Sequence, residues 1–177
     1  WGRGHAFETP LLKRMGEVEL KDQLEGVAHL QKMPFVDGSR IGLHGWSYGG
    51  FMAATAATKG EGKFKAVFVG APVTDWKYYD SIYTERYMKL PKDNEAGYRA
   101  SSVIGAAEKL SGKVLLMHGT SDDNVHMQQS MAFIDALMRA KKEFTFVPLP
   151  RQLHGPQDPA ARFYSNLRLV EFFEKNL

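Results

Sequence analysis

Apolar positions along the chain follow two periods, one typical of strands and one typical of helices. Residues that recur every three or four positions form stripes, as in a helix with one buried face. Strands and helices alternate from about Gly16 onward, which predicts an α/β fold with a mostly parallel sheet flanked by helices. Four short apolar runs are typical of strands buried on both faces of such a sheet: residues 40–45, 65–70, 113–118 and 143–147.

Four helices are expected around these runs. The first spans about residues 16–32, because apolar residues recur at Leu20, Leu24 and Val27. We interpret the Met and Phe residues of the later stripes as core packing and not as a binding site. The later helices are expected over the small residues 50–58, around the stripe of residues 131–138, and from the stripe of residues 163–173 to about residue 175.

The connection from Pro72 to Ser102 is longer and richer in Trp and Tyr than a simple link between elements. Long connections in α/β domains often carry functional residues. We therefore expect one or two short helices here, close to a site.

Composition and charge exclude several classes of binding partner and of site. The chain has 177 residues, 23 basic and 20 acidic, with a formal charge of +3, and the basic residues are scattered among the acidic ones. This pattern argues against nucleic acid or an anionic membrane as the main partner. There is no cysteine, which excludes a disulfide framework, a thiolate metal site and a cysteine nucleophile. No stretch approaches the roughly 18 consecutive apolar residues of a membrane helix.

A G-x-S-x-G motif at residues 45–49 lies between a predicted strand and a predicted helix. A sharp turn at this point would hold Ser47 in a strained conformation, and the flanking glycines would let neighbouring backbone approach closely. The helix that follows would direct its first N–H groups, among them that of Tyr48, toward a developing oxyanion. The motif indicates a serine nucleophile; the alternative is that Ser47 merely caps the helix.

A serine nucleophile needs a base and an orienting carboxylate, which follow it in the order acid, then histidine, in this kind of fold. His154 fits this order, because it follows the last predicted strand in a loop next to Gly155. We interpret His118 as a residue at a strand end that satisfies backbone groups of a loop. Asp122 and Asp123 both follow the third strand, and spacing alone does not choose between them; the common hydrolase pattern H-G-x-x-D favours Asp122.

Several longer segments resemble the prolyl oligopeptidase family of serine peptidases, in particular the catalytic domain of its dipeptidyl peptidase IV branch. The most specific strings are G-W-S-Y-G-G at residues 45–50 and Y-Y-D-S-I-Y-T-E-R-Y-M at residues 78–88. Matching segments also occur at residues 2–4, 22–26, 36–50, 71–76 and 118–129. The resemblance therefore covers almost the whole chain and implies a partial α/β-hydrolase fold over residues 1–177.

The resemblance implies a set of roles. Ser47 would be the nucleophile, Asp122 the acid and His154 the base, with the Tyr48 N–H as an oxyanion donor. Asn124 would bind a substrate carbonyl. A small apolar pocket for a penultimate proline or alanine would be walled by Val73, Trp76, Tyr79, Tyr83 and Val125. For Tyr79 and Tyr83 the alternative is ordinary packing one helical turn apart.

The implied activity is release of N-terminal dipeptides from a peptide substrate through an acyl-enzyme. The alternatives are an acylaminoacyl peptidase or another hydrolase of the family, and a non-catalytic assembly module. No metal or organic cofactor is expected, because no cluster of His, Asp and Glu has ligand spacing and no G-x-G-x-x-G follows a strand. The resemblance favours a periplasmic or secreted location over a cytoplasmic one.

The sequence also departs from the family pattern. The acidic residue that commonly precedes the base is missing from Arg151-Gln152-Leu153-His154, and the first residue is Trp1, which leads us to expect a fragment or processed product. Relatives carry an upstream β-propeller and an opening hydrolase segment, which supply an anchor for the substrate amine and a tyrosine in the oxyanion hole. Without them we expect weak or no activity. We also expect an open edge on the strand at residues 41–45, and hence self-association or contact with the N-terminal portion.

Overall fold

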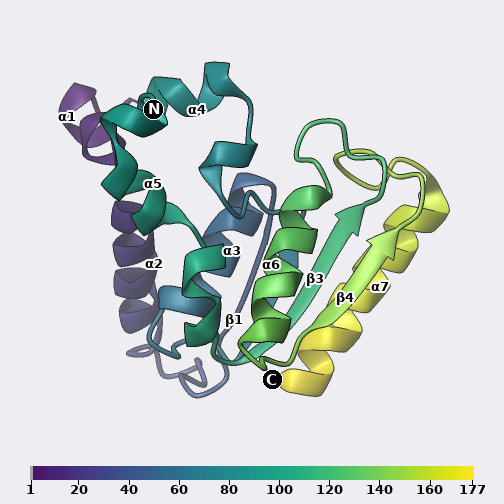
Figure 1. The fold of residues 1–177 in the computed structure, drawn as a ribbon. Coiled ribbons are helices and arrows are strands. Elements are labelled where there is room, and N and C mark those ends of the chain that lie inside the picture. Colours follow the sequence, from purple (N-terminus) through teal and green to yellow (C-terminus); the bar gives the residue numbers. More distant parts are fainter. Residues whose placement is uncertain (1) are drawn as a thin grey trace.

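The computed structural model describes residues 2–177, so Trp1 lies outside the described part. A four-stranded parallel sheet in the order β1-β2-β3-β4 forms the centre of the molecule (Figure 1). The strands are β1 (Gly42–Trp46), β2 (Ala66–Gly70), β3 (Lys113–Gly119) and β4 (Thr145–Leu149). The helices are α1 (His5–Glu8), α2 (Glu17–Leu30), α3 (Tyr48–Lys59), α4 (Ser81–Met88), α5 (Glu95–Ser101), α6 (Gln128–Arg139) and α7 (Pro159–Asn176), with short 3-10 helices at Thr9–Leu11, Trp76–Tyr78, Pro91–Asp93 and Ile104–Lys109.

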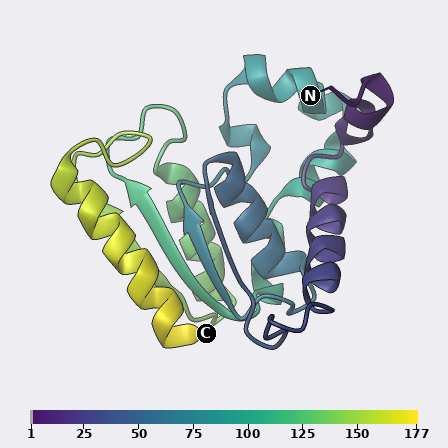
Figure 2. The ribbon, with the colours of Figure 1, turned by 180° about the vertical axis from the view of Figure 1, so that it is seen from behind.

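Helices cover both faces of the sheet. The views in Figures 1 and 2 show α7 on one face, and α3 and α6 on the other, with α2 packed outside α3. Side chains alternate between the faces along each strand. In β2, for example, Val67 and Val69 join the large core beneath α2, α3 and α6, whereas Phe68 joins the smaller core beneath α7. The predicted parallel α/β architecture is therefore confirmed.

The prediction that all four strands are buried on both faces is right for the two central strands and wrong for the outer two. Every residue of β2 is buried, and so are all those of β3 except Lys113. By contrast, β1 is only partly buried and β4 alternates between buried and exposed positions. The reason is their place in the sheet, because β1 and β4 are its outer strands in the described part of the chain.

Parallel pairing brings the carboxyl ends of the strands to one edge of the sheet. Trp46 at the end of β1 pairs with Gly70 of β2, and Gly119 at the end of β3 pairs with Leu149 of β4. Loops that leave this edge carry the chemistry in open α/β sheets. The connection after β2 contains two α-helices, α4 and α5, which agrees with the one or two expected there. None of the helices within residues 2–177 combines the length and apolar character needed to cross a membrane.

Candidate active site

The turn between β1 and α3 holds Ser47 in a strained backbone conformation. Its φ of 62° and ψ of −119° lie in a region that non-glycine residues rarely adopt. Close packing enforces this turn: a Cβ on Gly45 would lie 2.1 Å from the carbonyl oxygen of Gly49, and one on Gly50 would lie 2.1 Å from that of Gly70. A Cβ on Gly49 would meet nothing within 4 Å. Close packing therefore requires a glycine at position 45 of the motif but not at position 49. It also requires Gly50, which lies outside the motif.

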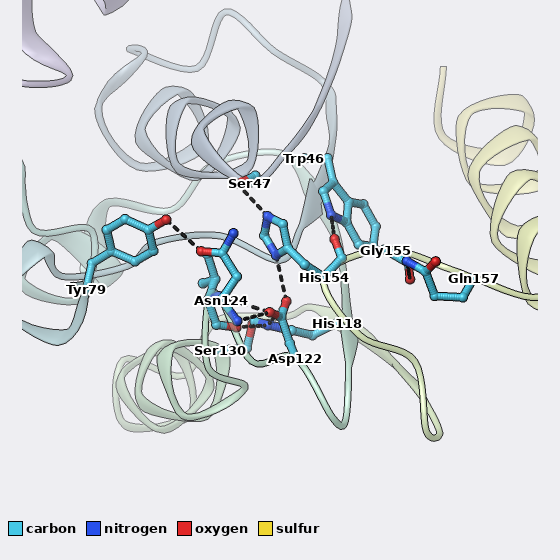
Figure 3. A network of polar contacts seen from close by, with 11 residues as sticks. Trp46, Ser47, Tyr79, His118, Asp122, Asn124, Ser130, His154, Gly155 and Gln157 are labelled. Carbon is cyan, nitrogen blue, oxygen red and sulfur yellow. Dashed lines mark hydrogen bonds and ion pairs between the residues drawn. The ribbon is translucent and has the colours of Figure 1, made fainter. Parts of the chain in front are cut away.

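Ser47, His154 and Asp122 form one chain of hydrogen bonds (Figure 3). The Ser47 Oγ lies 2.7 Å from His154 Nε2, and His154 Nδ1 lies 2.8 Å from Asp122 Oδ2. An ionised carboxylate only accepts, so His154 donates from Nδ1 and accepts the serine hydroxyl at Nε2. Ser47 stands at the N-cap of α3, but its side chain makes no capping hydrogen bond within the described chain. The geometry is that of a nucleophile, a base and an orienting acid.

The loop after β3 presents Asp122 and leaves Asp123 in solvent. The Asp122 side chain is fully buried, and its second oxygen, Oδ1, accepts hydrogen bonds from the backbone N–H groups of Asn124 and Val125. Asp123 is exposed. Asp122 thus holds the turn with one oxygen and orients His154 with the other.

His118 supports the same carboxylate from beneath. Its Nε2 lies 2.7 Å from the carbonyl oxygen of Val125 and 3.2 Å from Asp122 Oδ2, so this nitrogen carries a proton, and Nδ1 accepts from the Ser130 hydroxyl at 2.6 Å. Burial alone would raise the pKa of Asp122, but the hydrogen bonds from His118, His154 and the Asn124 N–H outweigh it and hold that pKa below its usual value. His118 does satisfy a loop backbone group, as predicted, but its contact with Asp122 was not foreseen.

The loop that carries His154 is held by hydrogen bonds from other side chains. The Nε1–H of Trp46, next to the serine, donates to the carbonyl oxygen of His154 at 2.7 Å. Deeper in the loop, the buried Gln152 donates to Asp158 Oδ2 and accepts from the N–H of Gln157, both at 2.7 Å. Sequence reasoning missed Trp46 and Gln152, because nothing in the local pattern indicates which partner a loop residue contacts.

Tyr48 opens α3 directly after the serine. Its backbone N–H is one of the first of the helix, which have no carbonyl partner one turn earlier, and the positive end of the helix dipole lies there. The N–H that the sequence predicts as an oxyanion donor thus lies at the start of α3, one residue from Ser47.

The residues expected to wall a pocket lie next to one another. Trp76 stacks on Tyr83 with 5.8 Å between ring centroids, and Tyr79 meets both rings edge-on. Tyr79 precedes α4, so its contact with Tyr83 is not packing within one helix. Val73 and Val125 are buried in the core cluster against which these tyrosines pack. Asn124 is exposed and its Oδ1 accepts the Tyr79 hydroxyl at 2.6 Å, which ties the aromatic group to the loop of Asp122.

Within residues 2–177, no three side chains of His, Asp or Glu are grouped in a way that could hold a metal ion. His126 lies two residues before α6 and is exposed, and His44 is an exposed residue of β1.

Known proteins are similar to this chain in both sequence and fold. Human dipeptidyl peptidase 8 is 38% identical over 179 residues, which cover 99% of this chain and 20% of that protein. Bovine dipeptidyl peptidase 4 is 39% identical over 182 residues, covering 98% of this chain and 24% of that protein. The crystal structure of dipeptidyl peptidase 4 from Porphyromonas gingivalis matches with a TM-score of 0.96 and 38% identity, over 99% of this chain and 25% of that one.

The chain thus spans about a fifth to a quarter of the length of these relatives. The family model for the prolyl oligopeptidase family matches residues 1–177, the whole chain. With its helix-flanked parallel sheet and its serine on a sharp turn between β1 and α3, the chain belongs to the prolyl oligopeptidase family of serine peptidases.

Proposed function

We propose that residues 1–177 are part of an α/β-hydrolase catalytic domain that releases N-terminal dipeptides from peptides with a penultimate proline or alanine. The observation that carries this proposal is the hydrogen-bonded chain from Ser47 through His154 to Asp122. The similarity to dipeptidyl peptidases supports the reaction class.

In the first half of the reaction, the Ser47 Oγ attacks the substrate carbonyl while its proton passes to His154 Nε2. Asp122 stabilises the imidazolium through the Nδ1–H bond, since its own pKa stays low. The oxygen of the tetrahedral intermediate is stabilised by the Tyr48 N–H at the start of α3. Collapse breaks the C–N bond, His154 gives its proton to the leaving amine, and the acyl group stays on Ser47.

In the second half, water replaces the amine. His154 takes a proton from the water, which attacks the ester carbon, and the C–Oγ bond then breaks as the proton returns to Ser47. The dipeptide leaves with a free carboxylate and the serine is restored.

The aromatic group supports the choice of substrate. Tyr79 and Tyr83 are partly exposed and offer flat, rigid apolar faces, and the buried Trp76 packs behind both rings. A proline ring can bury apolar area against such faces without needing a partner for an amide N–H. Val73 and Val125 would close this pocket, and the exposed Asn124 amide would bind a substrate carbonyl.

We further propose that this chain on its own is weakly active or inactive in peptide hydrolysis, although Ser47, hydrogen-bonded to His154, can still react with a small probe. The family resemblance assigns a second oxyanion donor and the anchor of the substrate amine to segments outside the chain, and removal of one oxyanion donor costs about 10²–10³ in rate. The partly exposed strand β1 supports self-association or contact with such a segment, because it pairs with β2 alone among the described strands. Light scattering at micromolar concentration tests the self-association; a monomer would count against it.

Labelling with a fluorophosphonate probe tests the nucleophile. The Ser47 Oγ would form a bond to phosphorus while fluoride leaves, so the chain should be labelled and Ser47→Ala should not. Equal labelling of the wild type and Ser47→Ala would show that Ser47 is not the nucleophile. The alternative function, a non-catalytic assembly module, would then be favoured.

Chromogenic substrates test the specificity. The full-length protein is tested on glycyl-prolyl and on N-acylated aminoacyl substrates, with its Ser47→Ala variant as the background. Ser47-dependent cleavage of the glycyl-prolyl substrate supports the proposal. Cleavage of the acylated substrate alone would favour an acylaminoacyl peptidase.

A further inference from the structure

The side chain of Tyr48 is held on three sides, although the reaction uses only its backbone N–H. Its ring packs against Phe51 and Trp76, with centroids 5.5 and 5.8 Å apart. Its hydroxyl donates a hydrogen bond to Glu19 Oε1, on the first turn of α2. The residue that supplies the proposed oxyanion donor is therefore connected to a different helix through its side chain.

Glu19 is itself fixed in place. Its other oxygen, Oε2, accepts the backbone N–H of Gly16 at 2.9 Å, which is the Glu half of a capping box at the first turn of α2. Gly16 has a φ of +86°, and a Cβ there would lie 2.6 Å from Phe51 Cζ, so the start of α2 rests directly on α3. Both carboxylate oxygens are thus committed, one to each helix.

In the hydrogen bond between Tyr48 and Glu19, the Tyr48 hydroxyl is always the donor. Burial and, after it, the hydrogen bond to Glu19 raise the pKa of Tyr48 well above its usual value. The phenol therefore stays protonated and donates throughout the pH range in which peptidases work. A hydrogen bond to a carboxylate is also stronger than one between neutral groups.

We infer that Glu19 is a positioning residue for catalysis, which holds the Tyr48 hydroxyl and thereby fixes the Tyr48 N–H where the oxyanion forms. The inference rests on the proposed function. Displacement of a catalytic group by about 1 Å can cost on the order of 10²-fold in rate. Loss of the Glu19 contact leaves the packing on Phe51 and Trp76, so the expected cost is smaller.

The experiment compares the rate of fluorophosphonate labelling with the fraction of protein finally labelled. The variants are Glu19→Ala, Glu19→Gln, Tyr48→Phe and the double variant Glu19→Ala/Tyr48→Phe. Asp22→Asn is the matched control, because Asp22 is an exposed acid on the same helix. The rate reports the geometry of the oxyanion hole in folded molecules, whereas the final fraction reports how many molecules are folded.

We expect Glu19→Ala to lower the rate about 10-fold without lowering the final labelled fraction, by comparison with the about 10²–10³-fold cost of losing a donor outright. Glu19→Gln should recover most of the rate, because its amide can accept from Gly16 and donate to the Tyr48 oxygen. Tyr48→Phe should match Glu19→Ala, and the double variant should be no slower than either. Asp22→Asn should stay within about twofold of the wild type. The pH midpoint of labelling should not move, because the two hydrogen bonds of Glu19 go to Gly16 and Tyr48 and not to His154 or Asp122.

A wild-type rate in Glu19→Ala, a fall in the labelled fraction alone, or additive losses in the double variant would each overturn the inference while Ser47-dependent labelling stands. If the wild-type chain shows no Ser47-dependent labelling, the proposed function fails, and the positioning role fails with it.

Discussion

Ser47 and His154 meet at one point but are held there by different kinds of constraint. The serine turn is fixed by backbone packed against backbone, at Gly45 against Gly49 and at Gly50 against Gly70. The histidine loop is fixed by individual hydrogen bonds, from Trp46 and around Gln152. Contacts of the first kind leave no room for an added atom. Those of the second kind contribute about 0.5–1.5 kcal/mol each and can be lost one at a time. The two sides should therefore fail differently.

The largest effect is expected where the histidine side depends on a charge. Asp122→Asn removes the carboxylate that orients His154 and stabilises its charged form, and we expect labelling and hydrolysis to slow on the order of 10⁴-fold. Asp123→Asn makes the same change at the exposed neighbouring residue and should leave the rate within about twofold. The labelling rates of the two variants show which aspartate orients His154. A large loss in Asp123→Asn and not in Asp122→Asn would contradict the assignment of Asp122.

A methyl group in the serine turn should come next. In Gly45→Ala the new Cβ would overlap the Gly49 carbonyl, so the turn must move, and we expect labelling to fall about 10²-fold and the free energy of unfolding by about 1–3 kcal/mol. Denaturant titration measures the second quantity. Gly49→Ala is the control for stability, because its Cβ meets nothing within 4 Å, and it should unfold at the same or higher denaturant. Equal destabilisation in both would show that the close approach is not what fixes the turn.

A smaller effect is expected from one hydrogen bond on the histidine side. Trp46→Phe removes the donor to the carbonyl oxygen of His154, and we expect labelling to slow about 10-fold, the equivalent of one such bond. The control Gln157→Ala removes an exposed, longer bond of 3.2 Å to Gly155 on the same loop and should change the rate less than about twofold. Complete loss of labelling in Trp46→Phe would contradict the view that the histidine loop, unlike the serine turn, is held by separate hydrogen bonds of modest strength.

The smallest effect concerns stability at low pH. The folded-state pKa of Asp122 lies below its unfolded value of 3.8, so its ionised form stabilises the fold above that value, and this contribution is lost as pH falls through the folded pKa. The difference in free energy of unfolding between wild type and Asp122→Asn should be constant near neutral pH and shrink below about pH 4. Denaturant titrations at several pH values measure it. If this difference in free energy of unfolding grew on acidification, the pKa of Asp122 would be raised by folding and not lowered.

The strands and long helices could be predicted because each shows its burial pattern locally. The first helix was expected over residues 16–32 and is α2, Glu17–Leu30; the third strand was expected over residues 113–118 and is β3, Lys113–Gly119. The last strand was placed too early, at residues 143–147 instead of Thr145–Leu149, and so ended before Pro148. An outer strand tolerates proline, because the missing N–H need not bond to a neighbour. The position of a strand in the sheet was the missing information.

In the site, too, some residues could be predicted from the sequence and others could not. Ser47, Asp122 and His154 could be named because the G-x-S-x-G spacing and the order along the chain restrict the choice, and the structure brings these three together. The supports of the site could not be named. Trp46 contacts a residue 108 positions away, and Glu19 contacts one 29 positions away. No local period encodes such a pairing, since it depends on how the helices and loops pack.

The distance along the chain between Ser47 and His154, 107 positions, has a consequence for biosynthesis. Contacts between residues far apart in sequence form late, because the intervening chain must be ordered first. During translation the N-terminal part emerges first, so the serine turn leaves the ribosome while its base is still unmade. The reactive hydroxyl then has no proton acceptor beside it until β3 and β4 have added to the sheet. The hydrogen bond between Ser47 and His154 therefore cannot form until synthesis has passed His154.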